Sequence, residues 1–139
     1  MIAYLDSSVL LRLVLSEPGR LHEWKAVETG VSSVIAEVEC LRTLDRLRLH
    51  GALSVADLAA RRQAVLRLLE GVELVQLAHQ VLRRAADPFP TPLGTLDAIH
   101  LATALAWRDE RKTTLVLATH DAQLALAAAA SGLDVIGMR

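Results

Sequence analysis

Short apolar runs alternate along this chain with longer stretches in which apolar residues recur at helical spacing. The short runs predict strands at residues 2–5, 31–32, 72–77, 114–118 and 134–137. The helical periodicity predicts helices at residues 8–15, 20–28, 33–50, 54–70, 80–86, 96–109 and 121–131. Because strands and helices alternate, the pattern favours an α/β, doubly wound fold with helices on both faces of a parallel sheet.

Several residues mark where these elements begin or turn inward. Ser54, followed three residues later by Asp57, resembles a capping box, and Thr95 is a suitable N-cap for the helix at 96–109. In the helix at 33–50, Val34, Val38 and Leu41 fall on one apolar stripe. The unbroken apolar run at 114–118 predicts a strand that is buried on both faces, as in a parallel sheet.

The composition limits the class of protein. The chain has 139 residues, of which 53% are hydrophobic, and a net charge of −1, so we expect one domain over residues 1–139. No apolar run reaches the roughly 18 residues of a membrane-spanning helix, and residues 1–15 make a poor signal peptide. Cys40 is the single cysteine, which fits a reducing cytoplasm. Near-neutral charge gives no global argument for nucleic-acid binding, so a polyanion would have to be bound locally.

Acidic residues follow the two best predicted strands. Asp6 ends the first strand, and Thr119, His120 and Asp121 follow the strand at 114–118. Sites in open parallel sheets form at the carboxyl ends of strands, close to the point where the strand order reverses. The sequence therefore predicts a functional site at this edge.

Four acids are candidates for that site: Asp6, Glu39, Asp97 and Asp121. Each also has a simple structural explanation. Asp97 and Asp121 would stabilise helix N-termini, Asp6 would cap the helix that follows it, and Glu39 would pair with Arg42 or Arg46 on a solvated face.

Convergence of several carboxylates has a chemical consequence. They repel one another unless a cation lies between them, and a site built of oxygen ligands suits Mg²⁺ or Mn²⁺ better than zinc. Such a site binds phosphate through the metal and activates water for attack on a phosphodiester. It does not require a basic protein. Cys40 is interpreted as a buried small residue, and His100 as a helix histidine bonded to a neighbour.

Four segments in order resemble the motifs of the PIN-domain ribonucleases. They are Asp6-Ser7-Ser8 after an apolar strand, residues 32–42, residues 96–104 around Asp97, and residues 118–121 with the small-residue helix that follows. In the second motif Arg42 follows Glu39 by three residues. Glu37 lies in the same motif; Glu39 is preferred because Arg42 has the family spacing from it and because Val38, not Glu37, flanks it on the apolar stripe side.

The resemblance covers essentially the whole chain and implies a PIN-like three-layer sandwich with a short, mostly parallel central sheet of four or five strands. It further implies a metal-dependent endoribonuclease, most like the VapC-like toxins of type II toxin–antitoxin pairs. The implied partners are RNA, a cognate antitoxin and a second copy of the chain. Asp6, Asp97 and Asp121 would be metal ligands, with Glu39 completing the site. Ser7, Thr119 and His120 would support it.

Two further hypotheses concern binding. All basic residues except Lys25 and Lys112 are arginine, and Arg42, Arg61 and Arg62 are candidates for RNA contacts, although solvated helix faces explain them equally well. The alternative function is a catalytically silent PIN-like module that binds a partner protein or nucleic acid. A receiver-like signalling domain fits less well, because no Lys follows residue 112.

Overall fold

The computed structural model describes residues 1–16 and 18–138. Its centre is a five-stranded sheet of order β3-β2-β1-β4-β5 in which every neighbouring pair is parallel. The strands are β1 (Ile2–Leu5), β2 (Thr29–Ser33), β3 (Val72–Val75), β4 (Val116–Ala118) and β5 (Asp134–Ile136). The expected α/β class and the parallel sheet are therefore confirmed.

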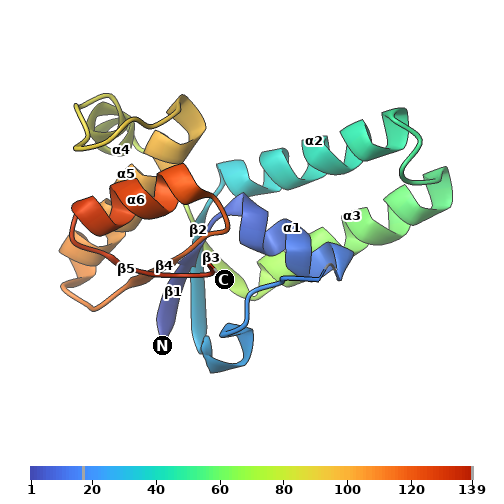
Figure 1. The fold of residues 1–139 in the computed structure, drawn as a ribbon, viewed down its shortest axis with the longest axis horizontal. Coiled ribbons are helices and arrows are strands. Elements are labelled where there is room, and N and C mark those ends of the chain that lie inside the picture. The colour runs from blue at the N-terminus through green and yellow to red at the C-terminus, as the bar shows by residue number, and fades with distance from the viewer. Residues whose placement is uncertain (17, 139) are drawn as a thin grey trace.

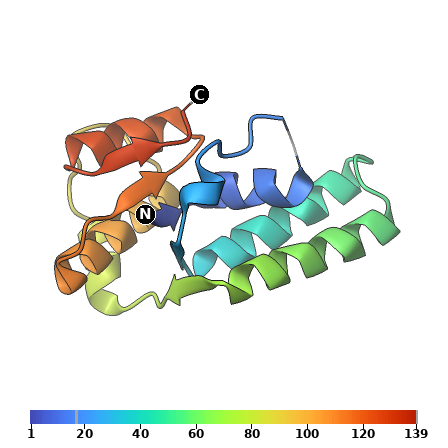
Figure 2. The same ribbon diagram turned by 90° about the horizontal axis from the view of Figure 1, so that it is seen from below.

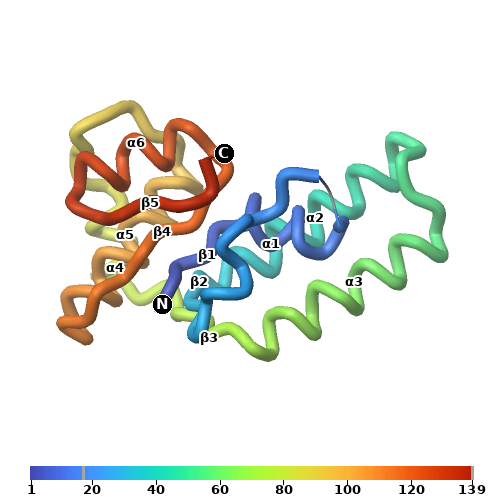
Figure 3. The backbone as a smooth tube through the Cα atoms, turned by 60° about the horizontal axis from the view of Figure 1, so that its bottom comes forward, coloured from blue at the N-terminus to red at the C-terminus, as the bar shows by residue number. Residues whose placement is uncertain are grey.

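Helices cover both faces of the sheet (Figure 1). They are α1 (Ser7–Leu15), α2 (Ile35–Leu49), α3 (Val55–Glu70), α4 (His79–Ala85), α5 (Thr95–Arg111) and α6 (Ala122–Ala130). One apolar cluster joins α1, α2 and α3 to Ala3 and Leu5, and a second joins α5 and α6 to Tyr4 and Leu117. Alternate residues of β1 thus point to opposite faces, which produces three layers (Figure 3).

The antiparallel helices α2 and α3 extend beyond the sheet as a long hairpin (Figures 1 and 2). Ser54 caps α3 by accepting the backbone N–H of Asp57 at 3.0 Å, as the capping-box pattern predicted. No helix in the described part of the chain is both long and apolar enough to cross a membrane.

Two predicted elements differ from the structure. The predicted helix at 20–28 is wrong: only Trp24–Ala26 forms a single 3₁₀ turn, and strand β2 begins at Thr29. Gly30 is the physical reason, because it lies inside β2, where an added Cβ would be 2.9 Å from Leu5 Cδ1. The small residue allows β2 to pack beside β1 and does not end a helix. The N-cap of α5 is Gly94, so the N-cap assigned to Thr95 is also wrong.

The strand order reverses between β1 and β4. From β1 the chain adds β2 and then β3 on one side, and later β4 and β5 on the other. The backbone N–H of Asp6 continues the pairing by donating to Ala118 O at 3.2 Å. The carboxyl ends of β1 and β4 therefore lie side by side, and this is the position that the strand-end acids share.

Candidate active site

Asp6 is a buried carboxylate, only 3% exposed, at the end of β1. It caps α1, and its Oδ1 accepts hydrogen bonds from the Ser8 hydroxyl at 2.6 Å and from Val9 N at 3.2 Å. Its Oδ2 accepts from the Thr119 hydroxyl at 2.6 Å. Three donors offset the cost of removing this charge from water, and they fix the carboxylate in one orientation.

Thr119 links Asp6 to the acid that follows β4. Its buried hydroxyl donates to Asp6 and accepts the backbone N–H of Asp121 at 3.0 Å. The exposed Asp121 caps α6, since its Oδ1 accepts from Leu124 N at 2.9 Å. The helix-capping explanation of Asp6 and Asp121 is thus correct, and both caps lie at the reversal point of the sheet.

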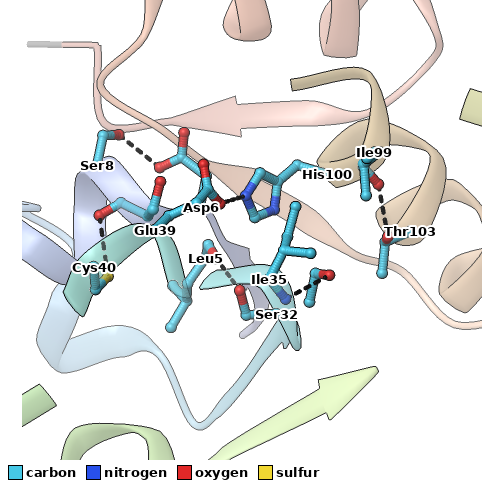
Figure 4. A network of polar contacts seen from close by, with 12 residues as sticks. Leu5, Asp6, Ser8, Ser32, Ile35, Glu39, Cys40, Ile99, His100 and Thr103 are labelled. Atoms are coloured by element: carbon cyan, nitrogen blue, oxygen red, sulfur yellow. Dashed lines mark hydrogen bonds and ion pairs between the residues drawn. The ribbon is translucent and has the colours of Figure 1, made fainter. Parts of the chain in front are cut away.

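Glu39 reaches the same region from α2 (Figure 4). Its Oε1 lies 2.5 Å from His100 Nε2 on α5, and His100 Nδ1 lies 2.6 Å from the Tyr4 hydroxyl on β1. The predicted pairing of Glu39 with Arg42 or Arg46 is wrong. Arg42 bonds Asp45 at 3.1 Å and Arg46 bonds Thr43 at 3.1 Å, because each of these partners lies one helical turn from its arginine on α2.

Asp97 lies half-buried in the first turn of α5. Its pKa is raised to about 6, first by burial and then by the negative charges of Asp121, Asp6 and Glu39, while His100 opposes the shift. Each of the other three acids therefore acts electrostatically on Asp97. The four carboxylates that the sequence singled out converge on one region.

Two non-acidic side chains record the same negative potential. The pKa of Cys40 is raised to about 12, first by burial and then by the charges of Glu39 and Asp6. The pKa of Tyr4 is also raised well above its usual value, first by burial and then by Asp6. The thiol is buried and uncharged, which fits the interpretation of Cys40 as a small core residue and not a nucleophile.

The donor set is chemically suited to a hard divalent cation. It consists of carboxylate oxygens from four parts of the fold, and after burial the charges of Asp121, Asp6 and Glu39 contribute to the raised pKa of Asp97. Within the described residues no group of three or more His, Cys, Asp or Glu side chains is close enough to hold an ion in this arrangement. Asp6, Asp121 and Glu39 are instead each bonded to hydrogen-bond donors of the protein.

Several supporting assignments change. The serine that donates to a site carboxylate is Ser8 and not Ser7, whose carbonyl oxygen accepts from Cys40 Sγ at 3.9 Å. The difference follows from helix geometry, since the second residue after an N-cap can turn back toward it. His120 does not extend toward the acids: its Nδ1 is 2.6 Å from Gly137 O at the end of β5.

Gly137 permits that contact. It has a positive φ of 102°, and an added Cβ would lie 2.4 Å from Thr119 O, so only glycine fits against this strand end. The close approach brings the end of β5 against Thr119 and His120. It thereby supports the loop that carries Asp121.

The three arginines that are candidates for RNA contacts lie in different environments. Arg61 is partly buried on α3, and its Nη1 donates to Val14 O at the end of α1 at 2.8 Å, so it stabilises the C-terminus of α1. Arg42 is paired with Asp45 on the surface. Arg62 is exposed on α3. In the described part of the chain, no hydrogen bond or ion pair joins these three arginines to the four acids.

The apolar stripe through Val38, which favours Glu39 over Glu37 in the sequence, is not the buried face of α2. Val38 is 60% exposed, and α2 buries Ala36, Cys40 and Leu44 instead. The contact with His100 and the charge felt by Asp97 favour Glu39 on independent grounds. Sequence reasoning missed Ser8 and Tyr4; the only available signal was that Tyr4 is the single tyrosine and stands two residues before Asp6.

Known proteins resemble this chain in sequence and in fold. The family model of the PIN domain matches residues 3–130. Ribonuclease VapC47 of Mycobacterium tuberculosis (strain CDC 1551 / Oshkosh) is 31% identical over 108 residues, 73% of each chain. Ribonuclease VapC46 of Mycobacterium tuberculosis (strain ATCC 25618 / H37Rv) is 36% identical over 104 residues, 73% of this chain and 72% of its own.

Solved structures share the fold at lower identity. A toxin–antitoxin complex from Klebsiella pneumoniae superposes with a TM-score of 0.68 at 17% identity, covering 96% of this chain and 95% of that one. VapBC-5 from Mycobacterium tuberculosis, a member of the VapBC family of toxin–antitoxin systems, gives 0.62 at 19% identity over 97% of both chains. The chain belongs to the PIN-domain family, among the relatives of the VapC ribonucleases.

Proposed function

We propose that this protein is a metal-dependent endoribonuclease and the toxin of a type II toxin–antitoxin pair, with Asp6, Glu39, Asp97 and Asp121 forming its active site. The observation that carries the proposal is the link between Asp6 and Asp121 through Thr119 at the reversal point of the sheet, with Glu39 reaching the same region from α2. After burial, the charges of these three acids also contribute to the raised pKa of Asp97 on α5. The relatives named ribonucleases and the toxin–antitoxin complexes of like fold support the same activity.

Asp6, Asp97 and Asp121 would hold Mg²⁺ or Mn²⁺, and Glu39 would complete the site. When bound, the cation would polarise the scissile phosphate and favour ionisation of water for attack on phosphorus. Asp6 is already oriented by Ser8, Val9 and Thr119, so it provides a fixed point for the ion. The Thr119 hydroxyl bonds both the Asp6 carboxylate and the Asp121 backbone N–H, so it fixes the position of Asp121 relative to Asp6.

The surface suggests how partners are recognised. The exposed Arg62 is the candidate for a phosphate contact of the RNA, and reversing its charge should weaken RNA binding and flatten its salt dependence.

Protein partners would use other surfaces. Leu96 on α5 is 51% exposed and Leu126 on α6 is 60% exposed, and apolar surface of this kind supports a homodimer. An antitoxin would cover the acidic site, and both chains would act in the cytoplasm.

The test is cleavage of mixed cellular RNA by purified protein with Mg²⁺, with Mn²⁺ or with EDTA. Cleavage should require metal and should fall by at least about 100-fold in Asp6→Asn and in Asp97→Asn, because loss of a ligand is more damaging than loss of an outer contact. Asp57→Asn, which changes an exposed acid on α3, is the matched control. Cleavage that resists EDTA would refute the metal site, and RNA binding without cleavage would favour the silent module.

A further inference from the structure

We propose that His100 is a positioning residue which holds the Glu39 carboxylate at the active site, and that the Tyr4 hydroxyl orients its ring. The inference rests on the proposed function, because it assumes that Glu39 takes part in the metal site. Neither Tyr4 nor His100 was expected to act on a site carboxylate from its type or spacing. Their role follows from a chain of contacts that spans the sheet and both helical layers.

The chain has three members from three elements. Tyr4 on β1 lies 2.6 Å through its hydroxyl from His100 Nδ1, and His100 Nε2 lies 2.5 Å from Glu39 Oε1. The rings of Tyr4 and His100 meet edge to face, with centroids 5.7 Å apart and planes at 71°. The imidazole is therefore held both at its nitrogens and by its faces, with one nitrogen aimed at the carboxylate of α2 (Figure 4).

These contacts select one tautomer of the ring. Tyr4 is fully buried, and a phenol keeps its proton at neutral pH, so its hydroxyl can donate to His100 Nδ1. A neutral imidazole accepts at one nitrogen and donates from the other. With the phenol donating to Nδ1, the proton of the ring is on Nε2 and is donated to Glu39. The buried Tyr4 thus fixes the orientation of the His100 ring, and the ring in turn fixes the Glu39 carboxylate.

A histidine that served only the core would not require this arrangement. His100 is 1% exposed on a helix whose neighbours Ala98, Leu101 and Ala102 are packed without polar contacts. Its two polar atoms point in opposite directions, one to the sheet and one to the half-buried Glu39 at the edge of the acidic cluster. The contact uses Oε1, so the second oxygen of Glu39 is the one that can turn toward a cation beside Asp97. Partners of metal-binding side chains commonly fix orientation in this way.

The first experiment measures Mn²⁺ affinity by calorimetry on the full chain. We expect His100→Leu to raise the dissociation constant by about 10- to 100-fold, which is typical for loss of a partner of a metal-site residue. His100→Gln retains an N–H that can reach Glu39 and should recover part of that loss, and Tyr4→Phe should show a smaller weakening. Trp107→Phe, a buried change on the same helix, should leave the constant unchanged.

A double-mutant cycle separates positioning from general destabilisation. If His100 acts through Glu39, then adding His100→Leu to Glu39→Gln should change the dissociation constant less than twofold. Equal losses in both backgrounds would overturn the proposal, and so would wild-type affinity in His100→Leu. If the leucine variant does not fold, wild-type affinity in both His100→Gln and Tyr4→Phe would overturn it in the same way.

The second experiment needs no metal. Nitrogen-15 chemical shifts of His100 in the metal-free protein should show a proton on Nε2, and Tyr4→Phe should broaden or shift them. A ring without a proton on Nε2 would overturn the proposal. If wild-type protein binds no Mn²⁺ while the tautomer is as expected, the proposed function fails instead. If Asp6→Asn and Asp97→Asn abolish binding but His100→Leu does not, only the positioning role fails.

Discussion

Asp6 and Asp97 lie at the same end of the sheet, but the protein treats their charges in opposite ways. Asp6 is nearly fully buried and accepts three hydrogen bonds from Ser8, Val9 and Thr119. Asp97 is half-buried, and burial, reinforced by the charges of Asp121, Asp6 and Glu39, raises its pKa to about 6. The β1–β4 side of the site is thus stabilised by the protein itself, whereas the α5 side is left with repulsion that a cation can relieve.

This difference bears on the proposed metal site, which would have to be well ordered and still favour the binding of a cation. If every carboxylate had donors like those of Asp6, a cation would have to displace them all. If every carboxylate resembled Asp97, the empty site would repel itself and lose its geometry. One satisfied acid sets the position, and one unsatisfied acid supplies the driving force.

The largest effect should come from removing the satisfied acid. Asp6→Ala removes the cap of α1 and leaves the Thr119 and Ser8 hydroxyls without their acceptor. We expect the free energy of unfolding of the metal-free protein to fall by about 2–4 kcal/mol, from a cap worth ~1 and buried bonds to a charge worth ~1.5–3. Urea denaturation measures it, with Glu110→Ala, a change of an exposed acid near the end of α5, as the control. An unchanged midpoint would show that Asp6 is not held as described.

A smaller loss should follow from Thr119→Val, which keeps the shape and removes the hydroxyl. Asp6 Oδ2 and Asp121 N then both lose a partner in a buried place. We expect a loss of about 1–3 kcal/mol, against about 1 kcal/mol for Ser8→Ala, because Oδ1 keeps its bond from Val9 N in that variant. The reverse order of the two losses would contradict the central place given to Thr119.

Asp97→Asn should have the opposite sign. Its folded-state pKa is raised, so ionisation of Asp97 opposes folding at neutral pH, and the neutral amide relieves that cost. Because the carboxylate is half-exposed and water screens it, the gain should stay below about 1 kcal/mol. Thermal denaturation without metal tests it. Addition of Mg²⁺ should then stabilise the wild type but not the variant, and a destabilised metal-free variant would contradict the comparison.

The smallest effect on stability is a dependence on pH. Below pH 6 a proton occupies Asp97 and competes with the cation, so Mn²⁺ affinity should fall by up to about tenfold per pH unit from pH 6 to pH 5. The stability of the metal-free protein should move the other way, rising as the pH falls through 6 toward the usual Asp value of 3.8. Calorimetry and denaturation at pH 5, 6 and 7 measure both. Parallel trends would disprove the sign of the shift.

The sequence predicted the fold and the place of the acids because both depend on local pattern. Apolar runs located the strands, and the strand-end positions of Asp6 and Asp121 followed directly. The prediction of a helix at 20–28 is wrong because Gly30 does not end a helix. It lies in β2, where the absence of a side chain makes room for Leu5 of the neighbouring strand β1. The contact of His100 with Glu39 joins residues 61 apart, and no spacing rule encodes which side chains of α2 and α5 meet.

The bond between Asp6 and Thr119 joins residues 113 positions apart and therefore bears on when activity can arise. The strand that carries Asp6 is made first, but its partner strand β4 and the cap Asp121 come near the end of the chain. A growing polypeptide still on the ribosome has neither the donor that orients Asp6 nor the full set of acids. At the proposed active site the acids therefore come together only after the last strands have been made, so the proposed cleavage of RNA would begin after translation of the chain is complete.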